Sequence, residues 1–384
     1  MIHTLKTLAF VTAVSMSAFT VAQAQQPTVF ASGLLNPSKI ILGPTGTLLS
    51  AEMGATPNTG RVSVISSSGA RRTLIDALPS GLAAPNGDPD GANGLALNGN
   101  TLYVAIGEGD TFVNGTQPGT AVVNPVGFSS PIFSTVLQFN LSKSPDQIQA
   151  GFTLGAADQS TLADGNTVTL SNSAGDTATV ILLSAFRYRP DPNAIYRNSH
   201  PYGLEIISAD PGHLYMVDAG LNSLVQIDTQ TGKAHTLAHF ANVPNLGSSG
   251  PPVAEAVPDS VRAYGNQLLV TFLSGFPFTP GDSKVVLVDP ATRNVAPFIN
   301  FQSSIIDIVY RTRSIPQSQF FEVEYSANLS TGQPGRVLQF DSPAGTVLAD
   351  GLNGPSSLAL DTSAGTLYIA SKTDGTILKI NVGQ

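Results

Sequence analysis

The fold is decided by the stretch from Asp350 to Ile380, which reads DGLNGPSSLALDTSAGTLYIASKTDGTILKI. A turn leads to a proline, and three short apolar runs follow, separated by polar turns that contain glycine, which is the pattern of consecutive β-strands. The same phrase stands near the other end of the chain, where Ser32–Glu52 reads SGLLNPSKIILGPTGTLLSAE. A structural phrase that recurs at both ends of a chain predicts a repeat array.

Four more copies of this unit lie between the two outer ones. They begin near Asn93, His200, Val257 and Ile305, which brings the number of units to six. Each unit contains short strands and tight turns in the amount needed for one blade of a propeller. The sequence therefore predicts an all-β fold, a six-bladed β-propeller with four-stranded antiparallel blades.

The last unit has only three strands of its own, and a fourth is available at the other end of the chain. The residues Thr28–Ala31 (TVFA) precede the first unit and can pair with the last strand. We expect the N- and C-terminal strands to share one blade, because this closure leaves no open sheet edge. Residues 25–384 then form a single propeller domain with insertions or loops at 107–131 and 151–198. Seven blades are the alternative, because the interval between the second and third units is long.

Composition supports this fold and narrows the classes of partner. The chain has 384 residues, with 37 Gly, 27 Pro and a charged fraction of only 11%. Gly and Pro at this frequency are typical of many short strands joined by turns. A net charge of −8 without a Lys/Arg cluster argues against nucleic acid as a partner. The lack of Cys excludes disulfides and thiolate metal sites.

The first residues have the pattern of a secretory signal peptide. Lys6 gives a positive start, Leu8–Val21 is an apolar stretch, and Ala22-Gln23-Ala24 is a small-x-small cleavage pattern. The apolar stretch is short for a membrane span, and no second long apolar run follows it. We expect a signal peptide at residues 1–24, no membrane anchor, and a protein exported to the periplasm or beyond.

The fourth unit carries the most distinctive run, Val257–Asp289, which reads VPDSVRAYGNQLLVTFLSGFPFTPGDSKVVLVD. Together with HPYGL at His200, VDAGLNSLVQID at Val217 and IIDIVY at Ile305, it resembles the ScyD/ScyE family, named for proteins encoded with scytonemin biosynthesis. The blade phrases are shared more loosely with NHL-type propellers. The resemblance implies an exported six-bladed propeller and implies no catalytic residue. The chain departs from the family at His200, where asparagine is usual, and at Phe272, where a carboxylate is common.

Candidate binding residues lie where the loops lead into the inner strands, because these loops converge at the mouth of a propeller's channel. Asn93, His200, Asp259 and Asp307 come from different blades, and we expect them to face a small molecule or a protein partner on this face. Glu52, Asn93, Asp259 and Asp307 are also candidate metal ligands, since Asn and carboxylate oxygens suit Ca²⁺ or another divalent cation. The simpler alternative is that these side chains bind loop backbones and line a wet channel.

Two classes of function follow from these features. The first is a binding or scaffold propeller that recognises its ligand at the channel mouth. The alternative is a divalent-metal-dependent lactonase or esterase of the gluconolactonase or paraoxonase type, in which the cation polarises a carbonyl group. The sequence contains no G-x-S-x-G, H-E-x-x-H, P-loop or EF-hand pattern, so no catalytic residue is identified from motifs.

Overall fold

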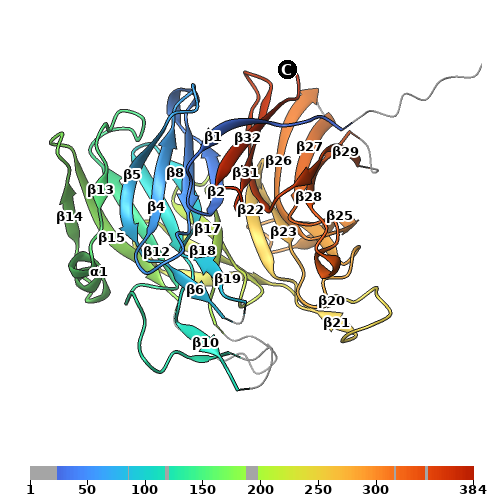
Figure 1. Cartoon of the computed structure of the whole chain (residues 1–384), viewed down its shortest axis with the longest axis horizontal. Coiled ribbons are helices and arrows are strands. Elements are labelled where there is room, and N and C mark those ends of the chain that lie inside the picture. The colour runs from blue at the N-terminus through green and yellow to red at the C-terminus, as the bar shows by residue number, and fades with distance from the viewer. Residues whose placement is uncertain (1–23, 85, 117–120, 187–197, 315–316, 342–344) are drawn as a thin grey trace, which may run out of the picture.

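Figure 1 shows the computed structural model of the chain, which describes residues 24–384 except 85, 117–120, 187–197, 315–316 and 342–344. Nearly all of the expected signal peptide, residues 1–23, lies outside the described residues. Among the residues that the structure describes, no helix has the length and apolar character needed to cross a bilayer.

Within the described residues, six antiparallel β-sheets form a ring of blades, so the expected six-bladed propeller is confirmed (Figure 1). In each blade the first strand lies innermost, against the central channel. From the channel outward, blade 1 contains β2 (Pro37–Leu42), β3 (Leu48–Glu52), β4 (Gly60–Ile65) and β5 (Arg71–Leu78), and blade 2 contains β8 (Ala92–Asn98), β9 (Thr101–Ile106), β12 (Thr135–Leu141) and β15 (Thr177–Ala185). In the same order, blade 3 contains β16 (Pro201–Glu205), β17 (His213–Asp218), β18 (Ser223–Asp228) and β19 (Ala234–His239), and blade 4 contains β22 (Pro258–Tyr264), β23 (Gln267–Phe272), β24 (Ser283–Val288) and β25 (Val295–Gln302). Blade 5 contains β26 (Ile305–Ser314), β27 (Gln317–Glu324), β28 (Gly335–Phe340) and β29 (Thr346–Leu352), and blade 6 contains β30 (Pro355–Asp361), β31 (Thr366–Ser371), β32 (Thr376–Asn381) and β1 (Thr28–Ser32).

Blade 6 closes the ring by joining the two ends of the described chain. Strand β1 pairs antiparallel with β32, and Val29 lies opposite Leu378. This is the closure expected from the sequence, and it gives the outermost edge of β32 a partner, which removes an open sheet edge. The four strands of blade 6 therefore fold together only when segments far apart in the chain meet.

The segment 151–198 contributes to the blades rather than standing apart from them. A hairpin there is formed by β14 (Val168–Ser171) and β15, and β15 is the fourth strand of blade 2. Before it, β13 (Phe152–Thr153) pairs parallel with β5 and is followed by α1 (Ala156–Ala163). At the end of the ring where the inner strands begin, the loops carry three small hairpins: β6 (Gly81–Ala83) with β7 (Asp88–Asp90), β10 (Phe112–Asn114) with β11 (Ala121–Val123), and β20 (Val243–Pro244) with β21 (Val253–Ala254).

The hydrophobic core is divided among the six interfaces between neighbouring blades, each with its own cluster of buried side chains. The inner strands are largely buried on both faces, and they carry buried polar residues near their starts as well as apolar ones. The cluster between blades 1 and 2 is large and contains Phe139. The cluster between blades 4 and 5 is small among the described residues, with Leu269, Val285, Ile305 and Ile308 fully buried. Each blade is therefore stabilised by both of its neighbours.

Every inner strand carries a one-residue β-bulge near its start. In blade 6, Pro355 pairs with Ser371 and Ser357 pairs with Ala370, which leaves Ser356 without an opposing residue. A bulge re-aims the side chain at the end of a sheet. The residues at this bulge position in blades 1 to 6 are Ser38, Asn93, Tyr202, Asp259, Ile306 and Ser356.

Candidate functional site

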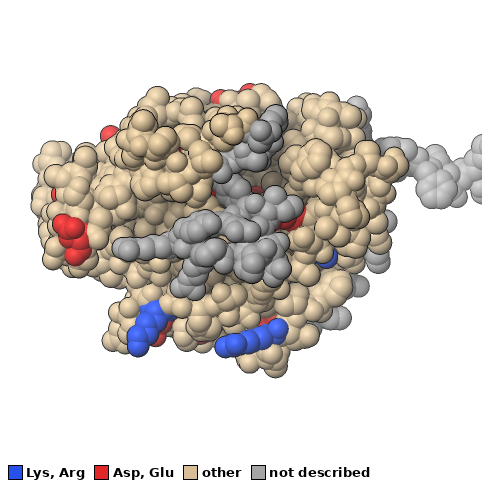
Figure 2. Space-filling model, turned by 90° about the horizontal axis from the view of Figure 1, so that it is seen from below, with Lys and Arg blue, Asp and Glu red and all other residues tan. Residues whose placement is uncertain are grey.

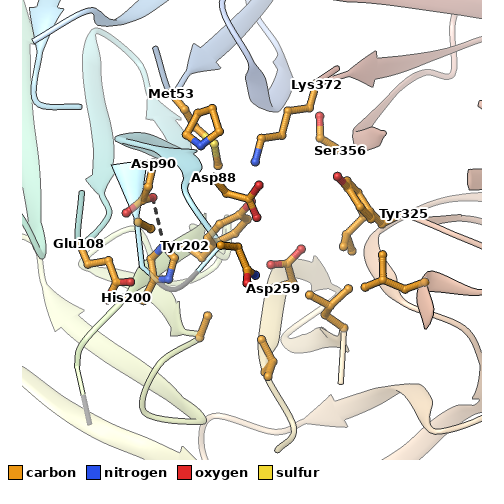
Figure 3. A pocket seen from close by; sticks show the side chains of 18 of the residues that line it. Met53, Asp88, Asp90, Glu108, His200, Tyr202, Asp259, Tyr325, Ser356 and Lys372 are labelled. Carbon is orange, nitrogen blue, oxygen red and sulfur yellow. Dashed lines mark hydrogen bonds and ion pairs between the residues drawn. The ribbon is translucent and has the colours of Figure 1, made fainter. Parts of the chain in front are cut away.

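A cavity of about 510 Å³ opens at the mouth of the central channel, at the end where the inner strands begin. All six blades contribute to its wall, and Figure 3 shows their side chains pointing inward. In five blades the contributing residue is the one that directly follows the second strand: Met53, Ala219, Leu273, Tyr325 and Lys372. One repeated structural position thus supplies much of the cavity wall, with different chemistry from each blade.

The face around this mouth has few charged groups. Figure 2 shows only scattered Lys, Arg, Asp and Glu on that face. Large apolar side chains are exposed on its loops, including Val126 at 91% and Phe276 at 67% exposure, together with Leu82, Phe128 and Leu246. Exposed apolar side chains gathered at one site are typical of surfaces that contact a ligand or partner.

Small polar side chains at the bulge position tie half of the ring together. In each case the side chain donates a hydrogen bond to the carbonyl of the first inner-strand residue of the next blade. The pairs are Ser356 Oγ with Pro37 O at 2.6 Å, Ser38 Oγ with Ala92 O at 2.8 Å, and Asn93 Nδ2 with Pro201 O at 3.2 Å.

In the other half of the ring, the bulge position carries Tyr202, Asp259 and Ile306, and all three line the cavity. Their side chains make no comparable bond to the next blade within the described part of the chain. An ionised carboxylate has no proton to donate, and an Ile side chain has no donor at all. The bulges of blades 3 to 5 therefore present their side chains to the cavity instead of to a neighbouring backbone.

Asp259 contributes a buried carboxyl group to the cavity. The residue is only 7% exposed, and its carboxyl group makes no hydrogen bond or ion pair with any described residue. Burial raises the pKa of Asp259 to about 7, although the charges of Lys39, His200 and Lys372 oppose this rise. Figure 3 shows the carboxyl group directed into the cavity. A buried carboxyl without a partner is costly unless a ligand, water or proton satisfies it.

Two of the residues singled out from the sequence, Asn93 and His200, meet at one edge of the cavity around Asp90. Asn93 Nδ2 donates to Asp90 Oδ1 at 2.7 Å and lies 3.1 Å from His200 Nε2. His200 Nε2 is 3.0 Å from the same Asp90 oxygen, and the Gly109 N–H donates to the other at 2.6 Å. Asp90 was not identified from the sequence, although it is the centre of this cluster.

Asp90 and His200 form an ion pair that joins blades 2 and 3. Burial alone would lower the pKa of His200, but the Asp90 carboxylate, with the charges of Glu108 and Asp218, raises it to about 10. The pKa of Asp90 is lowered in turn, since the imidazolium outweighs the effect of burial. At neutral pH His200 is therefore a cation held by a carboxylate, and it is not an available general base.

We expect the stability contributed by this ion pair to depend on pH in a defined direction. A His whose pKa is raised on folding stabilises the fold fully below its unfolded pKa of about 6.5, and this stabilisation is lost as pH rises through about 10. His200→Gln should therefore lower the free energy of unfolding at pH 6 by at least about 1 kcal/mol more than at pH 9.5. Chemical denaturation at both pH values measures this, with His235→Gln on the exposed part of β19 as control. An equal deficit at both pH values would contradict the assignment.

Asp307 does not line the mouth cavity, in contrast to our expectation for that residue. It lies one residue beyond the bulge, level with Lys39, Ser260 and Ser357 of other blades, and it binds all three. Ser260 Oγ and Ser357 Oγ each donate to it at 2.7 Å, and Lys39 Nζ lies at 3.1 Å. Arg262 donates through Nε at 2.9 Å and through Nη2 at 2.6 Å. We call these five residues the ionic plug.

The ionic plug crosses the channel below the mouth cavity. Burial would raise the pKa of Asp307, but Arg262 and Lys39 hold it well below its usual range. Burial, with the nearby Arg262 charge, lowers the pKa of Lys39 to about 8. Beyond the plug, two hollows of about 390 and 250 Å³ share Ile41, Glu205 and Arg262 in their walls. The plug therefore separates the mouth cavity from the far end of the channel.

Glu52 also lies away from the cavity. Its carboxylate accepts hydrogen bonds from Leu35 N at 2.5 Å and from Arg61 Nε at 2.6 Å within its own part of the ring. Glu324 occupies the same place in blade 5 and is likewise bound by an arginine, Arg336. This repetition indicates a structural role in which a buried carboxylate fixes the end of the second strand.

The four expected metal ligands do not share one site. Glu52 and Asp307 accept hydrogen bonds from protein donors, and Asn93 donates to Asp90, which leaves Asp259 available to a ligand. In the part of the chain that the structure describes, no group of three or more His, Asp or Glu side chains is placed to hold a metal ion. The arrangement suits hydrogen bonding and ion pairing with an organic ligand better than metal coordination.

No family model matches this chain, and no curated protein matches it either. Solved structures that it resembles include a chain of a nidogen/laminin complex, at 10% identity and a TM-score of 0.47, with 88% of this chain and 90% of that chain covered. Others are hydrazine synthase of Kuenenia stuttgartiensis (13% identity, 94% and 80% covered, TM-score 0.46) and a glucose dehydrogenase (12% identity, 94% and 100% covered, TM-score 0.46). Likenesses this distant transfer no site and no activity to this chain.

Proposed function

We propose that this chain is an exported binding propeller that holds a small organic molecule in the mouth cavity. The observation that carries the proposal is Asp259, a buried carboxyl directed into a cavity of about 510 Å³ with no hydrogen-bond or ion-pair partner among the described residues. Ligand sites are typically concave, mostly apolar, and equipped with a few polar groups that fix orientation. Export and kinship with the ScyD/ScyE family are part of this proposal, supported by the N-terminal Ala-Gln-Ala pattern and by the Val257–Asp289 run.

The alternative of a metal-dependent lactonase or esterase has less support from this site. That chemistry needs carboxylate, Asn or His ligands that converge on one cation. Glu52 is bound by Arg61 and Asp307 by Arg262, and His200 is paired with Asp90. A small-molecule ligand also explains the cavity better than a protein partner does, because a protein cannot place an extended surface inside a closed wall of six blades.

Filling the cavity should abolish ligand binding while leaving the ring intact. Ala219 lines the cavity, so Ala219→Trp places an indole ring in the ligand's space. We expect at least one compound in a metabolite library to raise the melting temperature of the parent by a few degrees, since saturation at a hundred times Kd is worth about 2.7 kcal/mol. The same compound should not shift Ala219→Trp. Differential scanning fluorimetry measures both.

The matched control is Ala157→Trp, which adds the same side chain to an exposed position on α1. Leu273→Trp is a second cavity variant, in case Ala219→Trp unfolds. The proposed function is wrong if no compound stabilises the parent, or if the active compounds stabilise Ala219→Trp and Leu273→Trp as much as the control.

A further inference from the structure

Asp259 and Lys372 carry opposite charges into the same cavity from different parts of its wall. Asp259 is the bulged residue of β22, and Lys372 directly follows β31. Figure 3 shows both side chains pointing into the open space. Neither makes a hydrogen bond or ion pair through its side chain with any described residue, and they do not pair with each other. Within the described structure, the cavity thus holds one acidic and one basic side chain that have no partner.

The rest of the wall is mainly apolar between these two groups. Leu273, Ile306 and Leu329 lie in it together with the rings of Tyr202 and Tyr325. Figure 3 shows the Asp88 carboxylate pointing into the cavity as well, but this residue is exposed, so water and salt screen its charge. A ligand that satisfies this wall needs a cationic group, an anionic group and an apolar body.

We propose that the cavity binds a zwitterion, an amino acid with a large apolar side chain, whose ammonium group contacts Asp259 and whose carboxylate contacts Lys372. This inference rests on the proposed binding function and names the chemical class of its ligand. The ligand's ammonium donates to the Asp259 carboxylate, and its carboxylate accepts from the Lys372 ammonium; among the described residues neither side chain has another partner. The side chain then packs against Leu273, Ile306 and Leu329.

The electrostatic surroundings of Asp259 support an ammonium contact. Its pKa is raised to about 7 by burial, so this carboxyl is partly protonated at neutral pH. The charged groups that act on it are Lys39 and Asp307 in the ionic plug, His200 in blade 3, and Lys372 across the cavity. A bound ammonium replaces the proton and pairs with the carboxylate, which burial in the cavity wall has already desolvated.

A polyol or sugar fits this wall less well. Such a ligand needs many neutral donors and acceptors, and Ser356 Oγ already donates to Pro37 O. Asn93 Nδ2 likewise donates to Asp90 and Pro201. Sorbitol and glucose are therefore the negative probes of the test.

The experiment compares three ligands of similar shape on the parent, two cavity variants and two control variants by isothermal titration calorimetry. L-Phenylalanine carries both charges, phenethylamine carries only the ammonium, and 3-phenylpropanoate carries only the carboxylate. We expect the parent to bind L-phenylalanine at least tenfold more tightly than either analogue, because each analogue leaves either the buried Asp259 or the half-buried Lys372 without its ligand contact.

The variants should then separate the two contacts. Asp259→Asn should weaken L-phenylalanine and phenethylamine at least tenfold and leave 3-phenylpropanoate unchanged. Lys372→Met should weaken L-phenylalanine and 3-phenylpropanoate and leave phenethylamine unchanged or tighter. Asp164→Asn after α1 and Lys233→Met before β19 are the matched controls, since both positions are exposed and neither lines the cavity.

Three results would overturn the inference. The first is equal affinity for all three ligands, the second is binding of sorbitol or glucose with none of L-phenylalanine, and the third is variants that bind as the controls do. If L-phenylalanine does not bind but the library yields a compound that Ala219→Trp blocks, the zwitterion is wrong and the binding function stands. If neither experiment yields binding, both proposals fall.

Discussion

Asp307→Ala is expected to lower the free energy of unfolding by about 3–5 kcal/mol, because removing one partner of a buried ion pair leaves the others uncompensated. Asp307 is fully buried and accepts hydrogen bonds from Arg262, Ser260 and Ser357, with Lys39 at 3.1 Å. These residues come from blades 1, 4, 5 and 6. The variant therefore loses contacts that join four of the six blades and buries two unpaired cations.

The measurement is urea denaturation of Asp307→Ala beside Asp307→Asn and the exposed control Asp164→Ala. Asp307→Asn keeps the shape but removes the charge, so it should also be strongly destabilised. The cost of both should shrink as pH falls below about 4, since a carboxyl whose pKa is depressed on folding loses its stabilising contribution there. A loss no larger than that of Asp164→Ala would show that the plug does not hold the ring.

Glu322→Leu is expected to act in the opposite direction and to raise the free energy of unfolding by about 2–4 kcal/mol at pH 7. Glu322 is fully buried, and both of its carboxyl oxygens lack a hydrogen-bond partner in the described structure. It lies on β27 two residues from Phe320, so both face the interface between blades 4 and 5. Burial, with the charge of Glu324, raises the pKa of Glu322 well above its usual range.

The sign of this effect also sets its pH dependence. An acid whose pKa is raised on folding must keep its proton in the native state, which costs about 1.4 kcal/mol for each pH unit above the unfolded pKa of about 4.3. The advantage of Glu322→Leu should therefore be small at pH 4 and grow toward pH 7 in thermal or urea denaturation. Glu322→Gln is the matched control: it removes the proton cost but keeps an unpaired polar group. A less stable Glu322→Leu at pH 7 would show that the carboxyl has a partner there.

The fold could be predicted from the sequence because its signals are local and repeated. Pro37 and Pro355 begin equivalent inner strands, and the glycine turns that follow stand at matching places in the first and last units. Closure by β1 also followed, because the last unit lacked a strand that Thr28–Ala31 could supply. These features can be recognised from residues that are adjacent in the sequence, together with the rule that sheet edges are paired.

The site was predicted in part, and the errors have a physical reason. Asp259 and Asp307 look equivalent as carboxylates near the start of inner strands, but the bulge falls at Asp259 in blade 4 and at Ile306 in blade 5. A shift of one residue moves a side chain from the mouth cavity into the ionic plug. Lys372 was missed because it follows a second strand and reaches the cavity only in the folded ring. Asp90 was missed because its partner His200 lies 110 residues away in the sequence.

The ionic plug also makes the two ends of the channel chemically independent. Lys39, Arg262 and Asp307 fill the channel along its axis, so the molecule has a separate hollow at each end instead of one continuous channel. A compound in the mouth cavity and a second compound in the hollows beside Glu205 should show no competition, since no shared space joins them. Substitutions in the wall of one hollow should therefore leave ligand binding in the other unchanged, provided that the ionic plug is kept.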